Sequence, residues 1–279
     1  MFQFKRFKIE QDLCAMKVGT DGVLLGAWAR GGGRMLDVGC GTGVIALMLA
    51  QRYPQGRVTA LDIDEGAVCQ TEQNVAQSPF ADRIEVLQTP IQNFNVQRST
   101  FNVQCYDAIV SNPPFFVDSL NAPDPQRNIA RHAETLTYSQ LMQAAWRLLK
   151  DDGELSVVVP FDYRRRMEDE AIFVGFFPSR VCAVRTAAHK APKRFLLAFR
   201  KHPCSCEKTE MTLGDETYTI LTRDFYLQLL LCKAECGVAN SSYLLLMKSC
   251  SDKVLPLSLI AVKHVDVHWA GDTVYAAFG

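Results

Sequence analysis

The 279-residue sequence has no apolar run long enough to cross a bilayer, and its N-terminus has no apolar stretch followed by a small-residue cleavage site. A membrane helix needs about 18 to 20 apolar residues, and a secretory signal needs both N-terminal features. Neither charge is in excess, because 30 Lys and Arg balance 30 Asp and Glu. We therefore predict a cytoplasmic protein without a membrane segment. The balanced charge excludes binding of nucleic acid through a high overall positive charge, but it does not exclude a local basic surface.

Paired metal-ligand motifs are also missing. The ten cysteines form no framework of paired Cys-x-x-Cys motifs, and scattered cysteines are expected to stay reduced in the cytoplasm. One segment, His202-Pro203-Cys204-Ser205-Cys206, holds three potential ligands. Because no second ligand pair stands at the spacing that zinc sites use, no metal is predicted.

The region from residue 34 to residue 200 alternates short β-branched runs with longer amphipathic ones, a pattern typical of βαβ units and a mostly parallel sheet. Strands are predicted at residues 34–38, 57–61, 83–87, 106–110 and 155–159, with an antiparallel pair at 181–185 and 195–199. Helices are predicted at residues 22–29, 44–51, 65–77, 138–149 and 163–172. We divide the chain into a lead-in (1–33), an α/β domain (34–227) and a C-terminal extension of unknown role (228–279).

A glycine-rich turn, Asp37-Val38-Gly39-Cys40-Gly41-Thr42-Gly43, joins the first predicted strand to its helix. Glycines allow a tight turn and a close approach of the backbone to a ligand. The helix that follows offers unpaired N–H groups and a partial positive charge. Asp62 ends the second predicted strand about 20 residues later, where a carboxylate can accept hydrogen bonds from both hydroxyls of a ribose. These features predict a cofactor that contains a nucleoside.

Two cofactor classes share those features, because Gly41, Gly43 and Ala46 also satisfy the dinucleotide template. Asp37 separates the classes, since it stands at the end of the strand before the glycines. A carboxylate there would repel a pyrophosphate but suits the ammonium group of an amino-acid cofactor. The turn therefore favours S-adenosylmethionine over a nicotinamide dinucleotide.

A second motif, Asn112-Pro113-Pro114-Phe115, follows the fourth predicted strand, and its four residues are the candidate catalytic residues. The prolines fix the backbone and remove two N–H donors, so the Asn112 side-chain oxygen and the Pro113 carbonyl can face one point as acceptors. An exocyclic amine has two N–H donors in one plane that match them. This arrangement frees the amine lone pair for in-line attack on a sulfonium methyl group, and Phe115 can stack on the ring that carries the amine.

Together the two motifs resemble those of class I amino-methyltransferases, which act on the N6 amine of adenine, the N2 amine of guanine or the side-chain amide of glutamine. Three further segments, at residues 16–28, 126–131 and 194–199, are similar to the bacterial valine-tRNA adenine-N6-methyltransferases. That family modifies the adenine at tRNA position 37, beside the anticodon. The resemblance covers residues 3 to 227.

The resemblance implies a class I methyltransferase Rossmann-like fold: a seven-stranded, mostly parallel sheet with an antiparallel last strand and helices on both faces. It also implies S-adenosylmethionine as cofactor and tRNA as substrate. Lys17 and Thr20 then belong to a segment over the cofactor pocket, and Ile63 flanks the cofactor adenine. The residues implied to bind the cofactor are Lys17, Thr20, Asp37, Gly39, Cys40, Gly41, Gly43, Asp62, Ile63 and Asn112.

The chain departs from the family pattern at two places. The family commonly has an Asp after the third strand that bonds the amine of the cofactor adenine, and Pro90 stands there in this chain. We therefore expect the cofactor to bind with one contact fewer. The family also ends near residue 227, whereas this chain continues to residue 279. The added residues are an interaction segment, a dimerisation element or sequence without function.

Basic residues gather in two parts of the sequence. Residues 178–201 contain seven basic residues and no acidic one, and the lead-in alternates basic residues with phenylalanines. Such surfaces contact phosphates while an unpaired adenine is splayed into the pocket. The basic run 164–166 is followed by acidic residues and is interpreted as a solvated helix face. The candidate RNA-binding residues are Lys5, Arg6, Lys8, Lys190, Lys193 and Arg194.

Other functions stay open from the sequence alone. The same chemistry would serve an rRNA guanine or a protein glutamine, although the basic residues favour RNA over a protein acceptor. A non-catalytic RNA-binding protein with this fold would have no need of the acceptor pair at Asn112 and Pro113. A nicotinamide oxidoreductase would leave the Asn-Pro-Pro-Phe motif unexplained. The sequence does not determine the oligomeric state.

Overall fold

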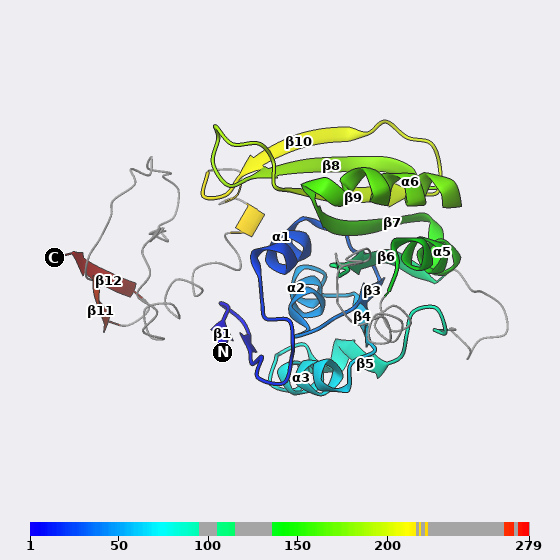
Figure 1. The fold of residues 1–279 in the computed structure, drawn as a ribbon. Helices are drawn as coiled ribbons and strands as arrows, with labels where there is room; N and C mark the ends of the chain where they lie inside the picture. Colours follow the sequence, from blue (N-terminus) through cyan, green and yellow to red (C-terminus); the bar gives the residue numbers. More distant parts are fainter. Residues whose placement is uncertain are drawn as a thin grey trace, which may run out of the picture.

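One large β-sheet organises the protein (Figure 1). The computed structural model describes residues 1–94, 105–114, 136–215, 218 and 221–222, together with the backbone of 265–270 and 273–278. The sheet has eight strands in the order β10-β8-β9-β7-β6-β3-β4-β5. These are β3 (Arg34–Val38), β4 (Arg57–Asp62), β5 (Ile84–Gln88), β6 (Tyr106–Ser111), β7 (Leu149–Pro160), β8 (Phe177–Arg185), β9 (Arg194–Arg200) and β10 (Glu207–Thr212).

The direction of the strands is mostly parallel. β3 pairs in parallel with β4 on one side and with β6 on the other, and β5 and β7 extend the sheet in parallel at either end of this group. β9 runs antiparallel to both of its neighbours, β7 and β8. The predicted fold class, with its closing antiparallel pair, is therefore confirmed.

Helices cover both faces of the sheet (Figure 1). One apolar cluster joins α1 and α2 to Met35 and Ala108, and the other joins α5 and α6 to Leu36 and Ile109. Consecutive residues of a strand thus pack into opposite clusters, because the side chains of a β-strand point alternately to the two faces of the sheet. Strands buried on both faces read as short apolar runs, which is why they could be predicted. The helices are α1 (Thr20–Trp28), α2 (Val44–Arg52), α3 (Glu65–Ala76), α5 (Tyr138–Leu148) and α6 (Arg164–Val174).

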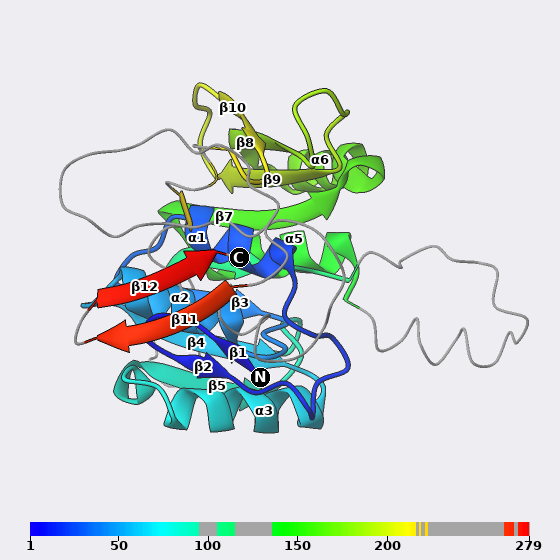
Figure 2. The same cartoon turned by 90° about the vertical axis from the view of Figure 1, so that its left-hand side faces the viewer.

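The lead-in begins with a small hairpin of β1 (Phe2–Gln3) and β2 (Lys8–Ile9). Figure 2 shows this hairpin close to α3 and β5. Phe7 contacts Phe80 beyond the C-terminal end of α3, with ring centroids 6.2 Å apart. Asn74 of α3 then accepts a hydrogen bond from the Glu10 N–H and donates one to the Glu10 carbonyl, both at 2.8 Å. The lead-in is therefore packed along α3 and shares the apolar cluster of α1 and α2.

β7 begins at Leu149. The sequence predicts that this strand begins six residues later, at residue 155, after a turn. The early part is held by two long-range contacts. Lys150 Nζ lies 2.5 Å from Asp107 Oδ1, and the buried Lys201 donates from Nζ to the Leu149 carbonyl at 2.6 Å. Because these partners come from β6 and from the residue after β9, both distant in the sequence, the polar residues 150–153 extend the sheet instead of ending the helix in a turn.

β10 is the strand that raises the number from the expected seven to eight. It lies at the edge of the sheet beside β8, and its first four residues are exposed while Met211 is buried. Edge strands with charged side chains carry no alternating apolar pattern. The sequence therefore offered no signal for it.

Little of the C-terminal extension lies within the described residues. β11 (Val265–Ala270) and β12 (Thr273–Phe278) pair antiparallel with each other. The division of the chain at residues 33/34 and 227/228 stays a prediction. None of the helices in the described residues has the length and apolar character of a membrane span.

Candidate active site at the carboxyl edge of the sheet

The predicted site residues follow the carboxyl ends of three adjacent strands. β3 lies between β4 and β6, and the chain leaves β3 toward β4 before it returns on the other side to form β6. Ligands of open α/β sheets bind at such a reversal of strand order. Asp37 and the glycine turn, Asp62, and Asn112 are therefore brought to one edge of the sheet.

The glycine turn adopts a backbone that only glycine accepts readily. Gly39, Gly41 and Gly43 have φ angles of 72°, 55° and 77°, which lie in the left-handed region. A Cβ at Gly43 would approach Thr71 Cγ2 to 2.8 Å, whereas no atom lies within 4 Å of a Cβ built at Gly39 or Gly41. The turn thus packs tightly on α3 at one end and leaves open space beside its first two glycines.

Asp62 is fixed toward this turn. Its Oδ2 accepts a hydrogen bond from the Gly41 N–H at 2.9 Å, and its Oδ1 accepts one from the Asp64 N–H at 3.1 Å. Each carboxylate oxygen keeps a second lone pair for a ligand donor. Ile63, the next residue, leaves 48% of its surface exposed, so an apolar side chain is available at the end of β4.

Asp37 is fully buried at the base of the turn. Its Oδ2 accepts a hydrogen bond from the Ala46 N–H at 3.0 Å, while its buried Oδ1 has no hydrogen-bond partner in the described residues. Burial, with a smaller contribution from Asp62, raises the pKa of Asp37 to about 7, although the Ala46 N–H opposes the shift. An orphaned carboxylate oxygen of this kind suits a cationic ligand group.

Cys40 is buried within the turn, and its Sγ lies 3.5 Å from Thr71 Oγ1. Burial raises the pKa of its thiol well above the ordinary range, so the thiol stays protonated and unreactive. Thr71 also donates a hydrogen bond to the Gly41 carbonyl at 2.7 Å. Cys40 therefore fills space beside the site, which agrees with its predicted place there but not with a nucleophile.

The loop that contains Lys17 lies against α3, because the Leu13 carbonyl stands 2.7 Å from a Cβ built at Gly66 and the Leu13 N–H donates to Gln70. Cys14 is buried in this loop. Burial first, and then the Asp62 and Asp64 carboxylates, raise the pKa of its thiol to about 11. Lys17 Nζ donates to the Gln11 carbonyl at 2.6 Å, so the loop is closed on itself. Thr20 is exposed at the first position of α1. Contacts of Lys17 and Thr20 with the cofactor stay predictions.

The Asn-Pro-Pro corner leaves the sheet beside the turn. Ser111, the last residue of β6, donates from Oγ to the Val38 carbonyl at 2.8 Å and so ties β6 to the end of β3. Asn112 Oδ1 is buried and makes no hydrogen bond with the described residues. Pro113 is buried and Pro114 is exposed, while Phe115 lies outside the described residues. An acceptor oxygen is thus present at the place where the sequence predicts one.

The sequence did not reveal the residues that hold the turn to the lead-in. Asn74 Nδ2 donates to the Thr42 carbonyl at 2.9 Å as well as to Glu10, and Gln70 Oε1 accepts from the Leu13 N–H at 3.0 Å. Both side chains are almost fully buried. Polar residues at apolar helix positions 70, 71 and 74 were the available signal, because buried polar groups need partners.

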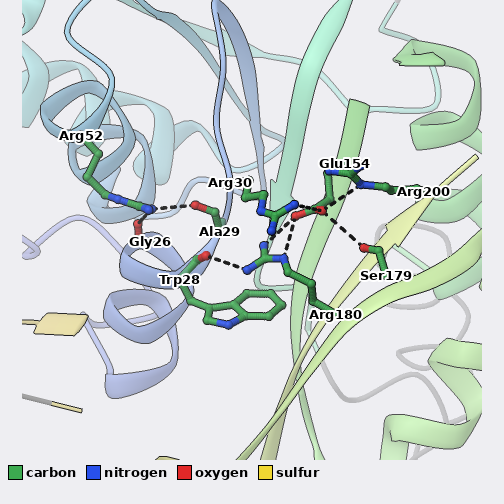
Figure 3. A network of polar contacts seen from close by, with 9 residues as sticks. All are labelled: Gly26, Trp28, Ala29, Arg30, Arg52, Glu154, Ser179, Arg180 and Arg200. Carbon is green, nitrogen blue, oxygen red and sulfur yellow. Dashed lines mark hydrogen bonds and ion pairs between the residues drawn. The ribbon is translucent and has the colours of Figure 1, made fainter. Parts of the chain in front are cut away.

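The basic stretch 178–201 is less available for RNA than its sequence indicates. Figure 3 shows Arg180 and Arg200 directed at Glu154, at 2.6 Å and 3.2 Å. Lys201 is buried, and Arg185 pairs with Glu210 at 3.1 Å. The stretch contains no acidic residue, but the fold brings acidic partners from other strands. It is therefore not one continuous basic surface.

The six candidate RNA-binding residues are placed differently from one another. Lys190 and Lys193 are exposed, in the connection between β8 and β9. Arg194 forms an ion pair with Asp21 of α1. Lys5, Arg6 and Lys8 are exposed on a hairpin whose Phe7 packs against Phe80, beyond the C-terminal end of α3. The group around residue 190 stands by the carboxyl end of β7, because the Phe161 N–H donates to the Lys193 carbonyl.

Two cavities in the described part of the protein lie elsewhere. One of about 170 Å³ is lined by Arg57, Thr59 and Tyr106, among others. Another of about 290 Å³ is lined by residues 31–33 and Asp107, among others. Both lie at the amino ends of the parallel strands. We place the site at the carboxyl edge on the chemistry of its residues, since a cradle of exposed glycine backbone need not form an enclosed cavity.

A glycine cradle lies beside Asp62, with the buried Asn112 oxygen one strand away, and the protein is a class I S-adenosylmethionine-dependent methyltransferase. The sequence matches the methyltransferase small domain over residues 19–173. The fold resembles that of a predicted O-methyltransferase from Agrobacterium tumefaciens, with a TM-score of 0.55 at 16% identity over 74% of this chain and 94% of that one.

Curated relatives give the particular family. The chain is 46% identical to the tRNA1(Val) (adenine(37)-N6)-methyltransferase of Bacteroides thetaiotaomicron, over 82% of this chain and 98% of that protein. It is 39% identical to the protein of the same name from Mannheimia succiniciproducens, over 81% and 94%. The chain therefore belongs to the tRNA1(Val) (adenine(37)-N6)-methyltransferase family.

These comparisons confirm the predicted family, the methyltransferase class and S-adenosylmethionine as the cofactor. The oxidoreductase and the non-catalytic alternatives are thereby set aside. In the described residues, no group of three His, Cys, Asp or Glu side chains is arranged to hold a metal ion. The roles of the individual site residues stay predictions.

Proposed function

We propose that this enzyme transfers a methyl group from S-adenosylmethionine to the N6 amine of adenine 37 in a valine tRNA. The observation that carries the proposal is the buried Asn112 Oδ1, which has no partner in the described residues and stands beside the glycine cradle. The names of the relatives support the choice of tRNA and of adenine. A tRNA substrate also implies a cytoplasmic location.

The cradle fits the cofactor in four respects. Open space beside Gly39 and Gly41 gives room for a ligand against the backbone. Asp62, held by two backbone N–H groups, keeps lone pairs for the ribose hydroxyls, and the orphaned Asp37 Oδ1 is available to the ammonium group. Ile63 offers an apolar surface for the adenine. The bound cofactor supplies an electrophilic methyl group.

Methyl transfer depends on the orientation of the accepting amine more than on a general base. The N6 amine donates its two hydrogens to Asn112 Oδ1 and the Pro113 carbonyl, which turns its lone pair toward the methyl group. Water can accept the released proton after transfer, so no side chain has to act as a general base. Phe115 is proposed to stack on the adenine ring, and Lys190, Lys193 and Arg194 are proposed to contact tRNA phosphates.

The direct test is methyl transfer from labelled S-adenosylmethionine to unmodified total tRNA, followed by nucleoside analysis. We expect the label in N6-methyladenosine, and mapping of the modified tRNA should place it beside a valine anticodon. Label in a guanosine of rRNA, or in protein glutamine, would replace the proposed acceptor with another planar amine. Cofactor binding without transfer to any of these acceptors would refute the proposed reaction.

A further inference from the structure

Phe161 is an exposed aromatic residue at the edge of the sheet that carries the site. It opens a 3-10 turn, η2 (Phe161–Tyr163), at the carboxyl end of β7, and 54% of its surface is exposed. Its N–H donates to the Lys193 carbonyl at 3.0 Å. The ring is therefore held beside the connection between β8 and β9, where two of the candidate RNA-binding lysines stand.

The base of the Phe161 ring is supported by a second aromatic residue. The centroids of Phe161 and Phe195 are 6.0 Å apart, with an angle of 38° between the rings. The Arg164 guanidinium lies 4.3 Å from the Phe195 centroid and 2.9 Å from Glu168. Phe195 is 4% exposed, so Phe161 presents its ring from a rigid support.

Uncompensated positive charge stands next to this ring. Lys190 and Lys193 are exposed, and neither forms an ion pair with a described residue. Arg194 and Arg164 are paired with acidic residues, while Asp162 is an exposed carboxylate in the same turn. Two exposed lysines without an ion-pair partner among the described residues, beside an exposed ring, match the chemistry of single-stranded nucleic acid, in which phosphates alternate with stacking bases.

The register of the sheet places Phe161 beyond the amine acceptor. Ser111 of β6 pairs with Val157 of β7, so Asn112 is level with Val158 and Phe161 follows three residues later. At about 3.3 Å per residue, Phe161 lies roughly 10 Å further out along the strands. A nucleotide that neighbours the methylated one can reach it.

We propose that Phe161 is a stacking platform for an unpaired base next to the methylated nucleotide, with Lys190 and Lys193 on the adjoining phosphates. This inference rests on the proposed function and adds a subsite for the RNA strand. Stacking on one aromatic side chain raises affinity by about 5- to 150-fold per base, so loss of the platform should be measurable as weaker RNA binding.

The test compares two exposed phenylalanines. Phe161→Ala should weaken binding of an unmodified hairpin RNA, carrying a valine anticodon loop, by roughly tenfold. Phe173→Ala is the matched control, because Phe173 is 83% exposed at the opposite end of α6, away from the site. It should bind the RNA as the wild type does. Cofactor affinity should be unchanged in both variants.

Two further measurements separate stacking from charge and from misfolding. Phe161→Trp should retain RNA affinity, since it keeps an aromatic face. Lys190→Ala and Lys193→Ala should each lower the slope of log affinity against log salt by about one, whereas Phe161→Ala should leave that slope unchanged.

The outcomes distinguish this inference from the proposed function. Suppose that the wild type methylates the RNA. If Phe161→Ala then binds it equally well, or Phe173→Ala loses as much affinity, the proposed stacking on Phe161 is refuted and the proposed function stands. If the wild type neither binds nor methylates any tRNA, the proposed function fails and the platform fails with it.

Discussion

At the scale of single residues, Asp37 is an acidic side chain that is fully buried. Its carboxyl is buried, with one oxygen bonded to the Ala46 N–H and the other without a partner in the described residues. Its folded pKa of about 7 lies above the unfolded value near 3.9. The folded protein therefore holds a proton that the unfolded chain has released, and its stability must depend on pH.

The first prediction concerns Asp37→Asn. A raised folded pKa contributes stability that is fully present below about pH 4 and is lost as pH rises through about 7. The wild type should therefore lose stability relative to the Asn variant between pH 4 and pH 7 and run parallel to it above. Urea unfolding of both proteins at a series of pH values checks this. A constant difference across the range would show that Asp37 is not protonated in the fold.

The second prediction concerns Asn112→Ala. Its Oδ1 has no partner among the described residues, so the substitution removes the oxygen that we propose as an acceptor for the target amine. We expect kcat to fall by about a hundredfold, as for loss of one oriented group at a reacting centre, while cofactor affinity changes little. Single-turnover transfer and cofactor titration measure the two quantities.

A matched control for Asn112→Ala is Gln55→Ala, which removes an exposed carboxamide in the turn before β4, at the opposite edge. It should be as active as the wild type. Normal turnover of the Asn112 variant would refute the role of this residue as the amine acceptor.

At the scale of elements, Glu154 of β7 joins three parts of the fold. Figure 3 shows its carboxylate among Arg30, which follows α1, Arg180 of β8 and Arg200 of β9. Ser179 adds a hydrogen bond at 3.3 Å, and Arg180 also lies 3.9 Å from the centroid of the Trp28 ring. Glu154 is 3% exposed, so its charge is compensated inside the protein.

The third prediction is that Glu154→Gln destabilises the fold by about 3–5 kcal/mol, because Arg180 would remain as a buried cation without a carboxylate. Glu210→Gln is the control. Glu210 pairs with Arg185 but is 65% exposed, so its loss should cost at most about 1 kcal/mol. Urea unfolding gives both values, and equal losses would contradict the prediction.

Most elements could be predicted because their signals are local. The bounds of β3 and β4 follow from apolar runs bounded by turn residues, and the start of α3 from Asp64, whose carboxylate accepts from the Gly66 and Ala67 N–H groups. β10 and the first part of β7 could not be predicted. Both consist of polar residues whose strand conformation depends on a neighbouring strand.

At the scale of the whole molecule, the relatives match most of the chain but not all of it. The B. thetaiotaomicron protein is matched over 98% of its length by 82% of this chain. Tyr218 and Thr222 are still buried against the sheet-bearing part of the protein. Tyr218 and Thr222, the last buried side chains of the described residues, thus both precede residue 228.

The fourth prediction concerns removal of the C-terminal extension. A protein ending at residue 227 should fold, bind S-adenosylmethionine and methylate tRNA at a rate within about twofold of the full chain, because the free energy of the core comes from residues it retains. Thermal unfolding and transfer assays on both lengths provide the check. An insoluble or inactive product would show that the extension belongs to the folded enzyme.

The sequence alone determined the fold class, the order of the elements and the two motifs, because turn residues and apolar periodicity act over a few neighbouring positions. It also determined which residues could meet, since parallel strands bring their carboxyl ends to one edge. Only the tertiary structure decided which charges stay free. Arg180 and Arg200 meet Glu154, and Arg194 meets Asp21, over separations along the chain that no local pattern encodes. Lys190 and Lys193 keep their exposed charge for the same physical reason: the fold brings no carboxylate of the described residues to them.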